Sequence, residues 1–178
     1  QPSYGINTLE VGENGVVNLP AGDYYIDELK MSKNTSINAI GSGTVRLYLN
    51  KKLNLSQGAR INFQGNPSKV FIYAYGDIDL KKNSTVNGYI YAQNKVKLMD
   101  GAIVTGSVSG KEVTLHKDSI INHNSTDIIN TDFGGNCTVG SSPPDNTTLL
   151  AEYRFDECSS ASNLLDTQGS YDAMAHGI

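Results

Sequence analysis

The acidic side chains that could act in acid–base chemistry alternate with lysines along this chain. Cleavage of a polysaccharide needs two carboxylates, or a carboxylate and a cation, gathered at one place. In five similar segments, however, the residue before the first apolar position changes sign each time. These residues are Glu28, Lys52, Asp77, Lys95 and Glu112. If the segments stack as neighbours, opposite charges lie side by side, and each exposed pair contributes about 0–1 kcal/mol. The pattern favours ion pairs on a solvated face, so we expect no catalytic residues.

The histidines do not form a metal-binding pattern. They are His116, His123 and His176, and none has the spacing to Cys, Asp or another His that a zinc site requires. We therefore expect neither a metal nor a cofactor.

The two cysteines, Cys137 and Cys158, flank a stretch rich in Gly, Ser and Pro. A disulfide between them would order a segment that has little else to order it, and two free thiols are the alternative. A disulfide would place the protein outside the cytoplasm.

Aromatic residues form a surface pattern that indicates binding. They alternate with apolar residues in three short segments, and alternation in a strand places the two sets on opposite sides. The outward set is Arg46, Tyr48, Phe71, Tyr73, Tyr75, Tyr89 and Tyr91. A contiguous aromatic patch usually contacts something. A glycan, a protein partner and the chain's own C-terminal residues are the candidates, and plain cross-strand stacking is the alternative.

These residues belong to a repeat whose segments align without gaps. The segments begin at Leu29, Leu53, Ile78, Val96 and Val113. Two places later come Met31, Leu55, Leu80, Leu98 and Leu115. Five places after the start only Asn, Gly or Asp occurs: Asn34, Gly58, Asn83, Gly101 and Asp118. The next residue is always small: Thr35, Ala59, Ser84, Ala102 and Ser119. The apolar period of two predicts strands, and Asn, Gly and Asp predict corners in the left-handed region.

The spacing of the segments predicts a single-stranded parallel β-helix. The starts lie 24, 25, 18 and 17 residues apart, which suits one coil each. Alternating residues before three of the starts predict a second sheet, and crossovers between parallel strands favour a right-handed coil. The two longer coils carry extra residues at 39–44 and 63–69, which read as loops at one corner. Nine places after each start stand Asn38, Asn62, Asn87, Thr105 and Asn122, which we interpret as a hydrogen-bonded ladder rather than a sugar site.

Composition restricts the partners. The 178 residues carry a net charge of −4 without a basic block, so we expect no nucleic acid partner. No apolar run is long enough for a membrane span. The chain begins at Gln1 with no signal peptide, which indicates a mature or trimmed form.

Four regions follow from these patterns. Residues 1–28 read as an N-terminal cap and an irregular first coil, and residues 29–133 as the β-helix, with a last partial coil at 125–133. Residues 134–148 read as a linker, and residues 149–178 as a C-terminal extension that is too short for a core of its own.

Three motifs resemble a known family. Leu-Pro-Ala-Gly-Asp-Tyr-Tyr at 19–25 and Asn-Ser-Thr-Val-Asn-Gly-Tyr-Ile-Tyr-Ala-Gln at 83–93 resemble the β-helix region of MSHA-pilus biogenesis (MshQ-like) proteins. Leu-Leu-Ala-Glu-Tyr-Arg-Phe-Asp-Glu at 149–157 resembles the start of a laminin-G-like (concanavalin A-like) jelly roll, although a whole jelly roll needs many more residues.

The resemblance implies a secreted or surface-exposed protein, extracellular or on the surface of a Gram-negative bacterium, linked to pili or adhesion, with no catalytic site to carry over. We therefore expect a non-enzymatic structural and adhesive module. A self-assembling scaffold of the bactofilin kind and a carbohydrate-active β-helix enzyme are the alternatives.

Overall fold

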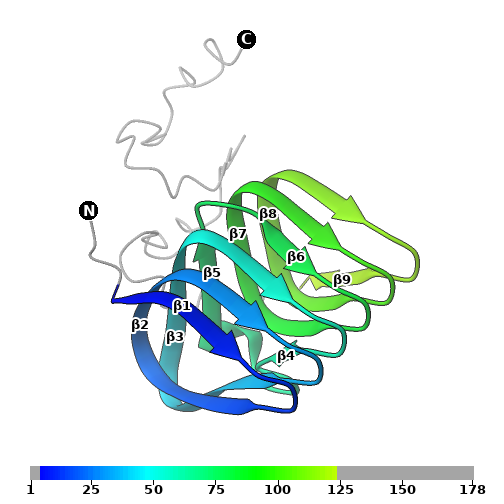
Figure 1. Ribbon diagram of the computed structural model, residues 1–178. Coiled ribbons are helices and arrows are strands. Elements are labelled where there is room, and N and C mark those ends of the chain that lie inside the picture. Colours follow the sequence, from blue (N-terminus) through cyan, green and yellow to red (C-terminus); the bar gives the residue numbers. More distant parts are fainter. Residues whose placement is uncertain (1–4, 124–178) are drawn as a thin grey trace, which may run out of the picture. The chain divides into compact units, whose positions relative to one another are not determined.

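A computed structural model of the chain describes residues 5–123, which form a stack of parallel strands wound into about six coils. Figure 1 shows the coils side by side, with the strands of successive coils aligned. The strands are β1 (Ile6–Val11), β2 (Val16–Met31), β3 (Ser36–Leu55), β4 (Arg60–Ile61), β5 (Val70–Ala74), β6 (Ile78–Leu80), β7 (Thr85–Leu98), β8 (Ile103–Leu115) and β9 (Ile120–His123). One 3-10 helix, η1, spans Pro67–Lys69. The prediction of a parallel β-helix is confirmed.

The register between coils is the one that the repeat predicts. Leu53 pairs with Leu29 on one side and with Ile78 on the other, and Val96 continues the column to Val113. The segments before the starts pair in the same way, with Leu47 beside Ile72 and Ile72 beside Ile90. Each coil therefore presents its alternating residues to the same positions of its neighbours.

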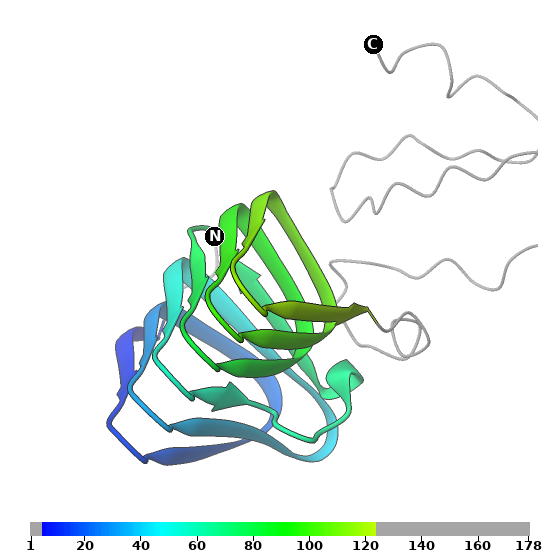
Figure 2. The same cartoon turned by 90° about the vertical axis from the view of Figure 1, so that its right-hand side faces the viewer.

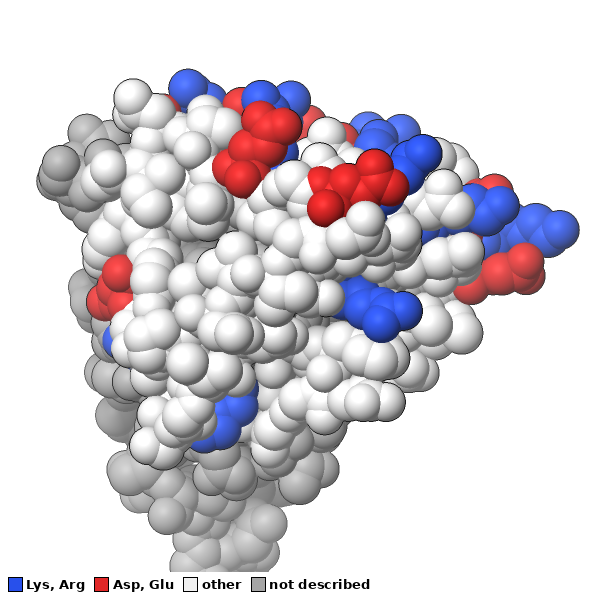
Figure 3. Space-filling model, turned by 60° about the horizontal axis from the view of Figure 1, so that its bottom comes forward, with Lys and Arg blue, Asp and Glu red and all other residues white. Residues whose placement is uncertain are grey.

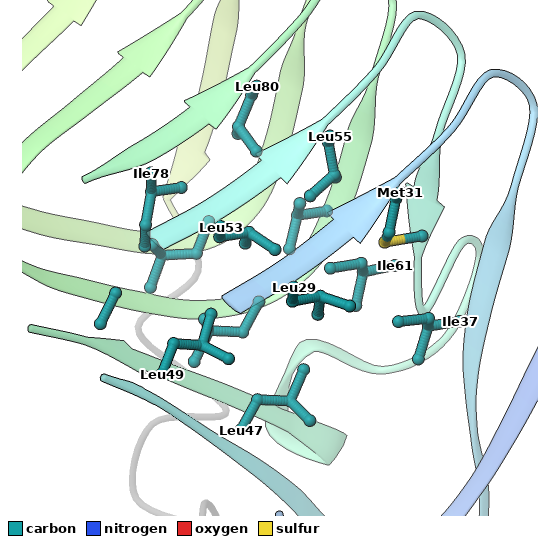
Figure 4. Close-up of a cluster of buried hydrophobic side chains, with 14 of the residues drawn as sticks. Leu29, Met31, Ile37, Leu47, Leu49, Leu53, Leu55, Ile61, Ile78 and Leu80 are labelled. Atoms are coloured by element: carbon teal, nitrogen blue, oxygen red, sulfur yellow. The ribbon is translucent and has the colours of Figure 1, made fainter. Parts of the chain in front are cut away.

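The core is a continuous aliphatic stack. Figure 4 shows the side chains of β2, β3, β4 and β6 meeting inside the coils. Leu29, Leu53, Ile78 and Leu80 are completely buried. Burial of such a side chain stabilises the fold by about 1.5–3 kcal/mol. Because the strands of each coil surround a common interior, these residues pack both within their own coil and against the next.

The predicted corner residues adopt the left-handed backbone. The φ angles are 57° at Asn34, 70° at Gly58, 56° at Asn83, 69° at Gly101 and 57° at Asp118. The first four of these corners are bonded to the following coil. For example, the Asn34 backbone N–H donates to the Gln57 carbonyl over 3.1 Å, and that of Gly58 donates to the Lys82 carbonyl over 3.0 Å.

The small residue after the corner turns inward, as expected. Thr35 and Ser84 are completely buried, and their hydroxyls donate to the carbonyls of Ser32 and Lys81, three residues earlier. These bonds allow a polar side chain to sit at a tight bend without an unpaired hydroxyl.

The first coil is more regular than the sequence interpretation supposed. Leu9 pairs with Leu29 and Val11 with Met31, and Asn14 takes a φ of 61° at the corner position. Asn18 then pairs with Asn38. The repeat thus begins one coil earlier, at Leu9, and that coil continues the same columns.

The extra residues of the two longer coils differ in structure. Residues 39–44 were expected to form a loop, but they lie within β3, where Gly41 and Gly43 have φ angles of 80° and 103° and the pairing with β2 shifts register. Residues 63–69 do leave the strands and end in η1. Figure 2 shows η1 projecting beside the coils. The Asn66 side chain caps η1 by accepting from the Ser68 N–H over 2.8 Å.

Several predictions concern residues outside the described part. The partial coil at 125–133, the linker at 134–148, the extension at 149–178, the Cys137–Cys158 disulfide and His176 all lie there. Within residues 5–123, no helix has the length and apolar character needed to cross a membrane.

Candidate functional site: an aromatic face

A column of four tyrosines runs along the coil stack on the outside of one sheet. Parallel pairing places Tyr25 beside Tyr48, Tyr48 beside Tyr73, and Tyr73 beside Tyr91. Ring centroids are 5.0 Å apart for Tyr25–Tyr48, 6.4 Å for Tyr48–Tyr73 and 4.9 Å for Tyr73–Tyr91. The first and last pairs are stacked, an arrangement that contributes about 0.5–1.5 kcal/mol beyond area burial.

The sequence interpretation missed Tyr25. Counting five places back from Leu29 reaches Tyr24, whereas the pairing of β2 with β3 shifts register between Ile26 and Glu28. This shift brings Tyr25 into the column. The Tyr24 hydroxyl instead donates to the Pro20 carbonyl over 2.8 Å. Only the strand pairing in the structure reveals that Tyr25, and not Tyr24, belongs to the column.

A second column lies beside the first. It consists of Asp23, Arg46, Phe71 and Tyr89, each paired with the next. The Arg46 guanidinium forms an ion pair with the Asp23 carboxylate. Phe71 meets the Tyr48 ring edge-to-face at 6.5 Å. All seven residues predicted from the sequence are thus close together, and with Tyr25 they form what we call the aromatic face: Tyr25, Arg46, Tyr48, Phe71, Tyr73, Tyr75, Tyr89 and Tyr91.

The aromatic face has a buried part and an open part. Tyr48, Phe71 and Tyr89 are buried, although they are not members of the hydrophobic core cluster inside the coils. Tyr73 and Tyr91 are half-buried, and Tyr75 is 42% exposed. The outward orientation expected from alternation is therefore present. Tyr75 is the exposed ring of the face, and Tyr25, at the other end of the column, is half-buried like Tyr73 and Tyr91.

The open part contains one polar residue that the sequence interpretation did not include. The Gln93 side-chain amide donates to the Tyr73 hydroxyl over 3.0 Å, and the Tyr75 ring meets Tyr73 edge-on at 5.0 Å. Burial, more than any other cause, raises the pKa of Tyr73. We call Tyr73, Tyr75, Tyr91 and Gln93 the tyrosine step. Gln93 stands two residues after Tyr91 in the same strand, a spacing that could have indicated it.

The charged residues next to the segment starts form a set separate from the two aromatic columns. Figure 3 shows most acidic and basic side chains along one margin, with a few others on an otherwise uncharged surface. Glu28 pairs with Lys30 at 3.1 Å and with Lys52 of the next coil at 3.3 Å, and Lys95 pairs with Glu112 at 2.9 Å. The alternation of charge therefore does form ion pairs between coils.

These pairs shift the pKa values of their members. The hydrogen bond from Lys30, followed by that from Lys52, lowers the pKa of Glu28. The bond from Lys95 lowers the pKa of Glu112, and its partner Glu112 raises the pKa of Lys95. All of these groups are solvated, and water screens their attraction, so each pair adds little to the stability of the fold. Their main effect is to favour the observed register between neighbouring coils.

The Asn positions nine places after each start form a ladder in part. The Asn38 amide donates to the Asn18 side chain over 3.0 Å. Asn62 instead donates to two carbonyls, those of Asn66 and Asn87, each over 2.9 Å, and Asn87 donates to the Gly65 carbonyl over 3.2 Å. Two of these side chains therefore hold the 62–66 turn against the next coil.

No metal centre is visible in the part of the chain that the structure describes, where His, Cys, Asp and Glu do not gather in groups of three or more. His116 and His123 lie in the last coil, apart from the aromatic face.

A family described as "Domain of unknown function (DUF8470)" matches residues 8–116, which is more than half of the chain. The chain belongs to this family. The DUF8470 match begins in β1 and ends one residue after β8, so it spans the coils from the first corner onward and includes both aromatic columns. No curated protein and no solved structure matches the chain.

Proposed function

We propose that this chain is a non-enzymatic structural and adhesive module of a secreted or surface-exposed bacterial protein, associated with pilus biogenesis or cell adhesion. The observation that supports it best is the aromatic face, in which rings from successive coils are held in register on the outside of a continuous core. Tyrosine is enriched at the centres of protein interfaces because its ring is large, rigid and amphipathic.

The coil stack suits a display role because each coil is bonded to its neighbours throughout. Strand pairing joins every pair of successive coils, and the corner bonds add a link at each turn. Such a frame loses little conformational entropy when an outer face binds a partner. The acidic residues Glu28 and Glu112 are engaged with lysines, which is the arrangement of a register device.

An adhesion assay tests this proposal. Beads coated with the full chain should adhere to bacterial or epithelial cells more than uncoated beads do. The double variant Tyr73→Ala, Tyr91→Ala should lose most of this adhesion, because both rings of the stacked pair are removed. The matched control is Thr105→Ala with Asn122→Ala, which changes a pair of residues in neighbouring strands that belong to neither aromatic column. Adhesion that survives in the tyrosine variant, with circular dichroism unchanged, would reject the role of the aromatic face.

End-to-end assembly of the bactofilin kind is a second candidate function, and the two terminal coils favour it. At the first coil Ile6 and Val16 are exposed, and at the last coils of the described part Val113, Leu115 and Ile120 are exposed. Exposed apolar residues at the end of a coil stack invite pairing with another chain. The expected partner is a second copy of the same chain, stacked coil on coil.

Light scattering during size-exclusion chromatography, over a range of protein concentrations, tests this second candidate. Assembly through the ends predicts a mass that rises with concentration and falls in the variant Leu115→Lys. A constant monomer mass in the parent chain would reject it.

A further inference from the structure

The tyrosine step is an open aromatic site held by rigid backbone. Tyr75 follows β5 directly, and its N–H donates to the Leu49 carbonyl over 2.9 Å. On the other side of the bend, the Asp77 carbonyl accepts from the Leu53 N–H over 3.0 Å. Between them Gly76 passes so close to the Lys51 carbonyl that a Cβ atom there would overlap it. Tyr75 is therefore presented at a bend that is fastened on both sides.

Cross-strand stacking does not account for Tyr75. The Tyr73 ring lies against Tyr91, its neighbour in the column, at an interplanar angle of 23°. Tyr75 stands at the end of β5, at 69° to the Tyr73 ring, and more than two-fifths of its surface is exposed. The two rings form an open angle rather than a flat surface.

The polar groups of the step are arranged for hydrogen bonding to a neutral ligand. Gln93 donates to the Tyr73 oxygen, and Tyr75 is a further hydrogen-bond partner of Tyr73, so these three side chains hold one another in place. The Gln93 amide oxygen can accept from an external donor. The step contains no Asp, Glu, Lys, Arg or His. Aromatic faces beside hydroxyl and amide groups suit a pyranose ring, which presents C–H groups on its face and hydroxyls at its edge.

We propose that the tyrosine step is a subsite for a neutral glycan, in which a pyranose ring packs against Tyr75 while Gln93, held by Tyr73, bonds one of its hydroxyls. This inference rests on the proposed adhesive function and names the class of partner. An anionic glycan is disfavoured because the step offers no cation to pair with a carboxylate or sulfate.

Saturation-transfer NMR and titration calorimetry on the full chain test the proposal, with cellohexaose, maltohexaose and mannohexaose as neutral probes and oligogalacturonate as the anionic one. At least one neutral probe should bind with a Kd of about 1 mM or lower. Tyr75→Ala should weaken that binding about tenfold, and Gln93→Ala should weaken it about threefold.

The matched control is Phe63→Ala. Phe63 is 43% exposed, close to the exposure of Tyr75, and it contacts Arg60 away from the step. This variant should bind the sugar as the parent does. Absence of saturation transfer from every neutral probe, equal binding by Tyr75→Ala, or binding of the anionic probe alone would each overturn the inference.

The outcomes separate this inference from the proposed function. Adhesion that depends on Tyr73 and Tyr91 without any sugar binding would support adhesion through a protein partner and overturn the glycan subsite. Sugar binding that depends on Tyr75, in a chain that adheres to no cell, would support the subsite and overturn the adhesive role. A chain that binds none of the sugars and adheres to no cell would overturn both the glycan subsite and the adhesive function.

Discussion

The side chain of Asn34 lies against Gly58 at the same corner of the next coil. A Cβ atom on Gly58 would stand 2.6 Å from the Asn34 amide oxygen, and both residues have left-handed backbone. The pair Asn83 and Gly101 repeats the relationship two coils further on. At these two corners the asparagine side chain therefore occupies the space that a side chain on the glycine of the next coil would need.

The first prediction is that Gly58→Ala destabilises the fold and that Asn34→Gly partly restores it. The left-handed backbone alone should cost about 1–2 kcal/mol, and the contact with Asn34 adds to it. Removing the Asn34 side chain relieves only the contact, so the double variant should recover at least about 0.5 kcal/mol. Urea denaturation of the four chains measures both terms.

Gly12→Ala is the control for this series, because nothing lies within 4 Å of a Cβ atom at Gly12. It should leave the urea midpoint nearly unchanged. Additive effects in the Asn34–Gly58 cycle would show that the close approach carries no energy.

The second prediction concerns the core. Leu80→Asp places a carboxylate at a completely buried position between coils and should cost about 4 kcal/mol or more, enough to unfold the chain. Asp79→Ala, at the neighbouring outward position, should melt like the parent. Thermal melting followed by circular dichroism decides it, and an unchanged melt for Leu80→Asp would contradict the register.

The third prediction is that Asn62 ties two coils together. Asn62→Gly keeps the left-handed backbone available but removes the bonds to Asn66 and Asn87, leaving two carbonyls without that donor. It should cost about 1–3 kcal/mol in urea denaturation. Asn38→Ala removes an exposed amide bond to Asn18 and should cost clearly less. Equal losses of stability in Asn62→Gly and Asn38→Ala would show that Asn62 does not tie the two coils together.

The fourth prediction is a pH dependence from the ion pairs. The pKa values of Glu28 and Glu112 are lowered in the folded chain, so each glutamate favours folding at a pH above its unfolded pKa. This contribution is lost as the pH falls through the lowered folded pKa. The double variant Glu28→Gln, Glu112→Gln should therefore show a weaker fall in urea midpoint between pH 6 and pH 3. Glu13→Gln, at an exposed corner, is the control, and 1 M NaCl should shrink the difference.

The fifth prediction is the Cys137–Cys158 disulfide, which lies outside the described residues. Closing a loop of about 20 residues would contribute roughly 3 kcal/mol. Intact mass after alkylation, with and without reductant, measures it. Two alkylated thiols in the unreduced chain would show that the bond is absent.

The sequence by itself determined the coil and its register. A repeat with an apolar period of two directs the same columns inward in every coil, and a one-residue slip would turn Leu53 or Ile78 into solvent. The corners were equally clear, because at Asn34 or Gly101 only a few residue types tolerate the left-handed backbone. The pairing of Lys95 with Glu112 followed from the same register.

Only the tertiary structure shows where the chain departs locally from the repeat, and these departures decide which side chains form the aromatic face. The register shift after Ile26 brings Tyr25 rather than Tyr24 into the column, and the amide of Gln93 reaches Tyr73 by a side-chain orientation that no spacing specifies. Exposure was likewise undetermined, because alternation says which way Tyr89 and Tyr75 point but not what surrounds them. One is buried and the other is open, since burial is set by everything packed around a residue rather than by its place in the strand.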